Sequence, residues 1–130
     1  MTTLVDTDVL IAHLRGDGAA TEFLLAARRA GPVAISVLTI TEITGGMRSN
    51  ERAATWRLLD TLDALSVTDA IAQRAGEFMR TYRRSHQGIG IADCIIAASA
   101  ESIGVHPATL NVKHYPMFPG LAPAYPLDSR

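Results

Sequence analysis

The sequence of 130 residues is poor in cysteine, lysine and aromatic side chains. Its single cysteine, Cys94, cannot form an internal disulfide and fits a reducing compartment. No apolar run reaches the roughly 20 residues that a membrane-spanning helix needs, and the most apolar run, 89–100, is interrupted by Gly90, Asp93 and Ser99. The first ten residues carry two acids and no base before their apolar segment, the reverse of a secretion signal. We therefore expect a cytoplasmic protein without membrane association.

The chain also lacks an excess of positive charge, because 12 basic residues face 13 acidic ones and the formal net charge is −1. Bulk electrostatics therefore do not predict nucleic-acid binding, although a local basic patch can provide it. Apolar residues make up 48% of the chain and charged residues 19%, which is typical of a globular protein. This length suits one domain with a true hydrophobic core. We expect a single domain over residues 1–130.

Short apolar segments alternate along the chain with helical patterns of apolar residues. This alternation predicts an α/β sandwich with a short, mainly parallel central sheet of four to five strands. Ligands of such sheets bind beyond the carboxyl ends of the strands. Ser36 and Asp69 are expected to be helix N-caps. The expected strands are 4–6, 33–36, 65–67, 108–110 and an edge strand around Tyr125, and the expected helices are 9–14, 19–29, 38–47, 51–64, 70–84 and 91–103.

Three acidic residues lie inside apolar stretches: Asp6 in LVDTDVLIA, Glu42 in VLTITEITGG and Asp93 in IGIADCIIAASA. Removing a carboxylate from water is costly unless it is paired or binds a metal. The basic residues that could pair with these acids lie mostly in the polar stretches of the sequence. Carboxylate oxygens are the ligands that Mg²⁺ and Mn²⁺ prefer, and such ions promote phosphodiester hydrolysis. We therefore expect the three acids to converge on a divalent cation.

Each acid also has a purely structural interpretation. Asp6, at a strand-to-helix junction, can be an N-cap, and Glu42, in the first or second turn of a helix, can complement the helix dipole. Asp93 is harder to explain in this way, because apolar residues surround it on every side of its expected helix. Convergence on one ion accounts for all three acids together.

Four segments resemble the PIN-domain family, and within it the VapC-type ribonuclease toxins of bacterial toxin–antitoxin pairs. They are DTDVLIAHL, SVLTITEITGGM, IGIADCIIAASA and TLNVKHYPMFPGL, in the order of the family and at compatible spacing. The resemblance implies a PIN-like α/β/α sandwich in which Asp6, Glu42 and Asp93 bind the metal. The fourth position of the family pattern falls on Asn111, where many PIN domains have an aspartate. Leu110 also departs from the pattern, because related toxins often have an arginine there.

The resemblance further implies a Mg²⁺- or Mn²⁺-dependent endoribonuclease that hydrolyses phosphodiester bonds of single-stranded RNA. Its products would carry a 5′-phosphate and a 3′-hydroxyl. The resemblance also implies that the protein is a homodimer and that a cognate VapB-like antitoxin neutralises it. Contact with DNA is then expected only indirectly, through the antitoxin.

A second group of residues is expected to support the acids. Thr7, Ser36 and Thr109 can orient carboxylates by hydrogen bonds, although ordinary backbone capping explains each of them equally well. Asp8 either approaches the same metal as Asp6 or lies outside the site and is solvated. Basic side chains can hold RNA phosphates, or simply form solvated helix ends. The candidates are Arg80, Arg83 and Arg84 around Tyr82, whose ring can stack on a base, and alternatively Arg15, Arg48 and Lys113.

Two other functions compete with the nuclease. The segment from Asp6 to Val9 satisfies the DxDxV signature of aspartyl-nucleophile phosphatases, with Asp6 as the phosphorylated residue and Asp8 as the general acid. That chemistry also needs a basic residue and a later acid pair such as GDxxxD; Lys113 is the only lysine and no such pair follows. The other alternative is a catalytically weak PIN fold that acts as an RNA- or protein-binding module, for which Asn111 is the supporting feature.

Overall fold

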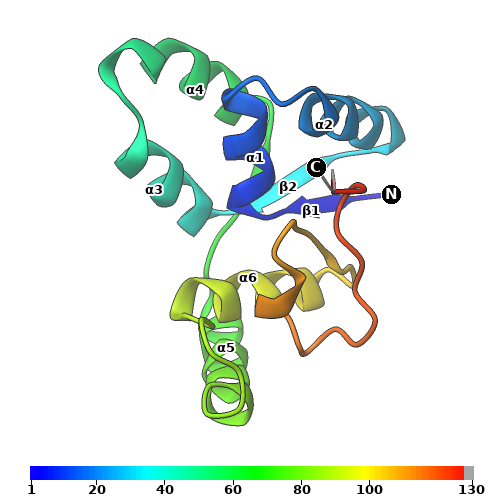
Figure 1. Cartoon of the computed structure of the whole chain (residues 1–130). Helices are drawn as coiled ribbons and strands as arrows, with labels where there is room; N and C mark the ends of the chain where they lie inside the picture. The colour runs from blue at the N-terminus through cyan, green and yellow to red at the C-terminus, as the bar shows by residue number, and fades with distance from the viewer. Residues whose placement is uncertain (128–130) are drawn as a thin grey trace.

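The computed structural model describes residues 1–127 and contains a four-stranded parallel sheet between two layers of helices (Figure 1). The elements are β1 (Thr3–Val5), α1 (Thr7–Leu14), α2 (Gly18–Ala30), β2 (Val33–Ser36), α3 (Val37–Gly46), η1 (Ser49–Glu51), α4 (Arg52–Leu59), β3 (Asp63–Leu65), α5 (Asp69–Tyr82), α6 (Ile91–Ser102), β4 (Pro107–Ala108) and η2 (Val112–His114). The strand order is β3-β2-β1-β4. The predicted α/β/α sandwich with a parallel sheet is confirmed.

The sheet separates two hydrophobic cores, as Figure 1 shows by the helices on its two faces. Helices α1 to α4 cover one face, and α6 covers the other with α5 packed outside it. Successive strand residues point to opposite faces, so Leu4 packs into the core under α5 and α6, while Val5 packs into the core under α1 and α2. Both side chains are fully buried. The central strand β1 therefore needs apolar residues at consecutive positions, and the first polar position after it is Asp6.

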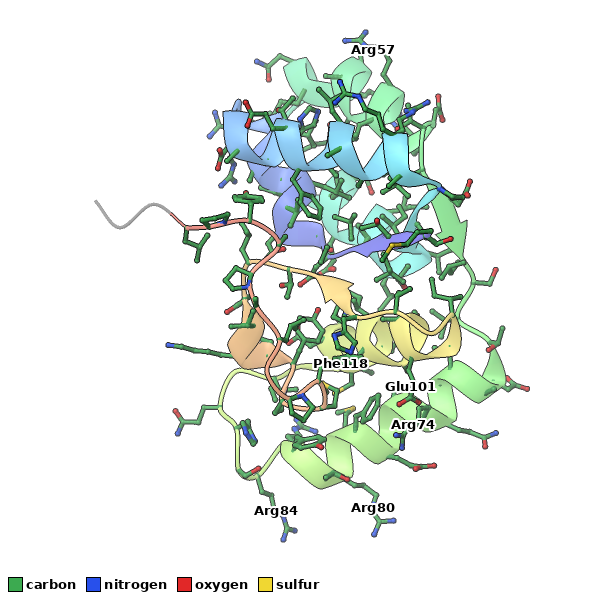
Figure 2. All side chains as sticks on the ribbon, turned by 90° about the vertical axis from the view of Figure 1, so that its right-hand side faces the viewer. Arg57, Arg74, Arg80, Arg84, Glu101 and Phe118 are labelled. Atoms are coloured by element: carbon green, nitrogen blue, oxygen red, sulfur yellow. The ribbon has the colours of Figure 1, made fainter. Side chains whose placement is uncertain are left out.

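The two helices of the second layer are joined by an ion pair on their outer surface. Arg74 of α5 binds Glu101 of α6 with an Nε to Oε1 distance of 2.7 Å, and its guanidinium lies 4.3 Å from the centroid of the Phe78 ring. Figure 2 shows Arg74 and Glu101 pointing toward one another between these helices. Exposed pairs of this kind contribute little energy, so the buried apolar surface between α5 and α6 is what holds this layer together.

The third strand was predicted at the wrong place. The helix expected over 51–64 ends at Leu59, and β3 covers Asp63–Leu65 rather than 65–67. Asp63 and Ala64 are exposed because β3 is an edge strand, and so it has no apolar pattern that a sequence argument could detect.

Two smaller predictions were also wrong. The N-cap of α5 is Thr68, whose hydroxyl accepts a hydrogen bond from Ile71 N (3.2 Å), and Asp69 is the first helical residue. Tyr125 lies in no strand; the chain beside it is tied to the end of β4 by one backbone bond, from Ala124 N to Thr109 O (2.8 Å). Among residues 1–127 there is no helix of the length and apolarity that crossing a membrane requires.

Candidate active site

Asp6 occupies the carboxyl end of the central strand β1 and is the N-cap of α1. Its Oδ1 accepts a hydrogen bond from Thr7 N (2.8 Å). Its Oδ2 accepts two more, from the Thr109 hydroxyl (2.8 Å) and from the Tyr115 hydroxyl (2.9 Å). The residue is only 7% exposed. Asp6 is therefore an N-cap, as its structural interpretation predicted. Capping occupies Oδ1 only, and Oδ2 accepts from Thr109 and Tyr115, which lie near the other end of the chain.

The electrostatic surroundings of Asp6 are unfavourable for its charge. Burial raises the pKa of this carboxyl above its ordinary value, and the hydrogen bonds from Thr109, Tyr115 and Thr7 lower it by a smaller amount. The negative charge of Asp93 raises the pKa of Asp6 further, so the two acids lie within electrostatic range of each other. A cation placed between them would relieve this repulsion.

Glu42 lies in the second turn of α3, the helix that follows the neighbouring strand β2. Its Oε1 accepts a hydrogen bond from the Thr7 hydroxyl (2.7 Å), and the Thr7 oxygen lies 3.1 Å from the hydroxyl of Thr39. Glu42 is exposed, so the expectation that its apolar neighbours in the sequence remove it from water was wrong. Those neighbours face the core from other sides of α3. Because Thr7 is the residue after Asp6, this hydrogen bond holds Glu42 next to the segment that carries Asp6.

Asp93 is the third residue of α6 and reaches back over the start of its own helix. Its Oδ2 accepts a hydrogen bond from Gly90 N (3.0 Å) and lies 3.2 Å from His114 Nδ1. The side chain is 20% exposed. The prediction that apolar residues enclose it on every side was wrong, because the nearby Ile91 is 63% exposed and leaves that end of the helix open.

Asn111 immediately precedes η2 and lies beside His114. Its backbone N–H donates to the Thr109 hydroxyl (3.0 Å), and its side-chain Nδ2 lies 3.2 Å from His114 Nδ1. Because His114 also contacts Asp93, it connects Asn111 to Asp93. Asn111 is exposed to solvent.

Asp8 faces the loop after β4. Its Oδ2 accepts a hydrogen bond from Leu110 N (3.0 Å) and lies 3.3 Å from the Thr109 hydroxyl oxygen. Its Oδ1 is buried and has no hydrogen-bond partner within residues 1–127. Burial, with the charge of Asp6 as a smaller cause, raises the pKa of Asp8 to about 6. Asp8 thus holds the loop that carries Thr109, and none of its hydrogen bonds goes to Glu42.

The donor atoms suit a hard divalent cation, because all three acids offer carboxylate oxygens. Within the described residues, Oε2 of Glu42 and Oδ1 of Asp93 accept no hydrogen bond, whereas their partner oxygens are held by Thr7, Gly90 and His114. A carboxylate that binds a metal is commonly oriented in this way, with one oxygen held by a hydrogen bond and the other available to the metal. Within residues 1–127, however, no group of three or more His, Cys, Asp or Glu side chains lies close enough together to hold a metal ion as the side chains stand.

The remaining candidates divide into near and distant residues. The Ser36 hydroxyl accepts from Leu38 N (3.2 Å), so it caps α3, and none of its hydrogen bonds goes to the three acids. Arg15 lines the same cleft of about 90 Å³ as Glu42. The charge of Arg83 acts on Cys94, the neighbour of Asp93, whereas Figure 2 shows Arg80 and Arg84 pointing away from the body of the molecule. Arg48, which precedes η1, and Lys113, in η2, are exposed.

Sequence reasoning missed two residues that contact the acids, Tyr115 and His114. Both belong to the segment TLNVKHYPMFPGL, but neither stands in an apolar stretch that makes its polarity unusual. Tyr115 is 1% exposed and is the largest of the fully buried side chains. A buried tyrosine usually has a partner for its hydroxyl, but only the folded chain shows that this partner is Asp6.

The sequence model of the PIN domain matches residues 3–112, which is most of the chain. The chain belongs to the PIN-domain family, as the four segments predicted. It is 53% identical over 122 residues to Ribonuclease VapC10 of Mycobacterium tuberculosis, covering 94% of this chain and 92% of that protein. It is 39% identical over 123 residues to Ribonuclease VapC19 of the same organism, covering 94% of this chain and 98% of that protein. A toxin–antitoxin complex from Klebsiella pneumoniae contains a chain with a TM-score of 0.78 and 26% identity, covering 96% of this chain and 99% of that one.

Proposed function

We propose that this protein is a metal-dependent endoribonuclease toxin that cleaves single-stranded RNA in the cytoplasm and is neutralised by a cognate antitoxin. The observation that carries the proposal is the position of Asp6: a buried carboxylate at the end of the central strand, linked through Thr7 to Glu42 and within electrostatic range of Asp93. The 53% identity to a protein named as a ribonuclease supports the substrate class.

Asp6, Glu42 and Asp93 would hold a Mg²⁺ or Mn²⁺ ion, with Asn111 at the edge of the same site. When bound, such an ion lowers the pKa of a coordinated water and stabilises charge on a phosphoryl group. The protein's own contribution is orientation: Thr109 and Tyr115 hold Asp6, Thr7 holds Glu42, and Gly90 and His114 hold Asp93. Glu42 is exposed, so rotation of its side chain can bring its available oxygen toward the other acids.

RNA phosphates would be held close to the acids, because the net charge of −1 gives no long-range attraction. We favour Arg15, which lines the same cleft as Glu42, and Arg83, whose charge acts on Cys94 beside Asp93. Arg80 and Arg84, which point away in Figure 2, would contact only a longer RNA that extends beyond the site. Lys113 adjoins Asn111 and Arg48 precedes η1, so both remain candidates for flanking phosphates.

The toxin–antitoxin complex among the structural neighbours supports a protein partner, which we propose to be a VapB-like antitoxin. Helices α1, α2 and α4 border an open cleft of about 470 Å³ whose lining includes Leu24, Leu25 and Leu58. Leu25 is 50% exposed, and Arg28 and Arg57 line the same cleft. An apolar helix face with acidic neighbours would suit this surface. We further propose a homodimer, with any contact to DNA made only through the antitoxin.

The decisive test is the Asp93→Asn variant. Asparagine keeps an oxygen that can accept the hydrogen bond from Gly90 N but removes the charge, so Mg²⁺-dependent cleavage of a labelled single-stranded RNA should fall more than a hundredfold while thermal unfolding stays unchanged. Asp63→Asn, on the exposed edge strand β3, is the matched control and should cleave as the wild type does. Unchanged cleavage by the Asp93→Asn variant would overturn the proposal.

The specific alternative is a PIN fold that binds RNA or protein with little turnover, for which the neutral, exposed Asn111 is the supporting observation. Two assays distinguish the nuclease from the binding module: RNA cleavage with Mg²⁺, Mn²⁺ or Ca²⁺, and RNA binding. A pure binder retains RNA but cleaves it with none of these ions. An aspartyl-phosphatase mechanism has less support, because Lys113 is the only lysine of the chain and no acid pair such as GDxxxD follows Asp6.

A further inference from the structure

Tyr115 lies just beyond residues 3–112, which the PIN-domain model matches, and its hydroxyl reaches Asp6. Its hydroxyl donates to Asp6 Oδ2 at 2.9 Å across a sequence separation of 109 residues. Its ring is fully buried in the core beneath α5 and α6, so the hydroxyl cannot leave this position without disturbing that core. We infer that Tyr115 is a positioning residue that holds the Asp6 carboxylate in the orientation required for metal binding. This inference rests on the function proposed above.

The direction of this hydrogen bond follows from the charges around it. An ionised carboxylate can only accept hydrogen bonds, whereas a tyrosine hydroxyl carries a proton that it can donate. The Tyr115 hydroxyl therefore donates, and Asp6 Oδ2 accepts. Hydrogen bonds to a charged acceptor are the stronger ones.

Tyr115 and Thr109 act on the same oxygen. Thr109 Oγ1 also lies 3.3 Å from Asp8 Oδ2 and carries a single proton, so Asp8 competes with Asp6 for it. The Tyr115 hydroxyl has Asp6 as its hydrogen-bond acceptor, with no second one within residues 1–127. The Tyr115 hydroxyl therefore donates to Asp6 alone, whereas the Thr109 hydroxyl can donate to either Asp6 or Asp8.

The chain offers a matched control in Tyr125. Its hydroxyl oxygen is also buried, but it has no hydrogen-bond partner within residues 1–127, and its ring packs against Phe23 of α2. Tyr115→Phe and Tyr125→Phe each remove one buried oxygen and keep the ring. Only the first of the two variants removes a donor to Asp6.

The experiment measures Mn²⁺ binding to the full-length wild type and to both variants, by electron paramagnetic resonance of the free ion and by calorimetry, without RNA. Removing a group that orients a metal ligand typically weakens metal affinity ten- to a hundredfold. We expect Tyr115→Phe to bind Mn²⁺ about tenfold more weakly, and Tyr125→Phe to bind it as the wild type does. In RNA cleavage, saturating Mn²⁺ should restore the kcat of Tyr115→Phe with an unchanged KM for RNA, which a general loss of structure would not allow.

An Asp6→Asn background isolates the contact. Adding Tyr115→Phe to Asp6→Asn should weaken residual Mn²⁺ binding by less than twofold, because the positioned carboxylate is already gone. The inference is overturned if Tyr115→Phe binds Mn²⁺ like the wild type, if Tyr125→Phe loses as much affinity, or if the wild type binds no Mn²⁺. Weakened Mn²⁺ binding in Tyr115→Phe, together with a wild type that cleaves no RNA, would support the positioning role and refute the ribonuclease.

Discussion

The candidate site has a closed side, formed by Asp6, Thr109 and Tyr115, and an open side, formed by Glu42 and Asp93. On the closed side, the carboxylate is 7% exposed and accepts three hydrogen bonds that come from two ends of the chain. On the open side, Glu42 is exposed and accepts one hydrogen bond, from Thr7, while Asp93 is held partly by its own helix start.

The difference follows from the elements that carry the acids. Asp6 follows the central strand β1, and the segment after the neighbouring strand β4 brings Thr109 and Tyr115 onto its side chain. Glu42 and Asp93 project from helices whose ends face solvent, where few donors are within reach. The closed side is thus preorganised, whereas the open side can adjust around an ion or a substrate phosphate. Three predictions sharpen this comparison.

The largest expected effect separates the two sides directly. Asp6→Asn should reduce Mg²⁺-dependent RNA cleavage more than a hundredfold, and raising the metal concentration should not restore it, because the amide lacks the negative charge and the enclosed position leaves no room for a water to replace the lost carboxylate oxygen. Glu42→Gln should lose less and recover partly at high Mn²⁺, because water can replace an exposed ligand. Single-turnover cleavage over a metal titration measures both, with Glu22→Gln on the exposed surface of α2 as control. A larger, irreversible loss in Glu42→Gln would reverse the comparison.

The second prediction concerns Asp8, whose pKa rises to about 6 in the folded chain from an ordinary 3.8. The folded state therefore binds more protons than the unfolded state between these values, and stability falls as pH rises through this window. With metal removed by a chelator, Asp8→Asn should raise the free energy of unfolding at pH 7.5 by about 1 to 3 kcal/mol, since it removes a costly buried charge. At pH 4 the gain should be largely gone.

Urea unfolding of both proteins at the two pH values provides the measurement. Asp63→Asn, at an exposed position, should show no comparable gain. An Asp8→Asn protein that is less stable than the wild type at pH 7.5 would mean that the charge of Asp8 holds the loop at Leu110 more strongly than burial opposes it.

The smallest effect is expected from the hydroxyl that joins the two sides. Thr7→Val removes the donor to Glu42 Oε1 and keeps the shape of the side chain, so cleavage should fall about tenfold. Ser36→Ala removes another buried hydroxyl, but one that caps α3, and should cost about 1 kcal/mol of stability with little change in cleavage. Equal losses of cleavage in both variants would indicate that Thr7 acts only through the fold.

Part of this site could be predicted from the sequence because a carboxylate in an apolar stretch is chemically unusual. The expected burial holds for Asp6, whereas Asp93 is 20% exposed and Glu42 is exposed, so for these two acids the argument assumed a burial that the fold does not provide. It could not predict β3, which is exposed at the sheet edge, or the cap of α5, where Thr68 and Asp69 are equally good candidates. It also could not distinguish the capping role of Ser36 from an orienting role, because both require a hydroxyl at the same junction.

The amino-acid sequence alone was sufficient for the layered parallel fold and the family, and it named the three acids of the candidate site, because these inferences depend on local apolar patterns and on short motifs. The donors that hold the acids were decided by the tertiary structure. Tyr115 donates a hydrogen bond to Asp6 across a sequence separation of 109 residues, and His114 of η2 contacts Asp93 of α6. No local pattern encodes such pairs, because a hydroxyl or imidazole acquires its partner only when strand order and loop path bring the two ends of the chain together.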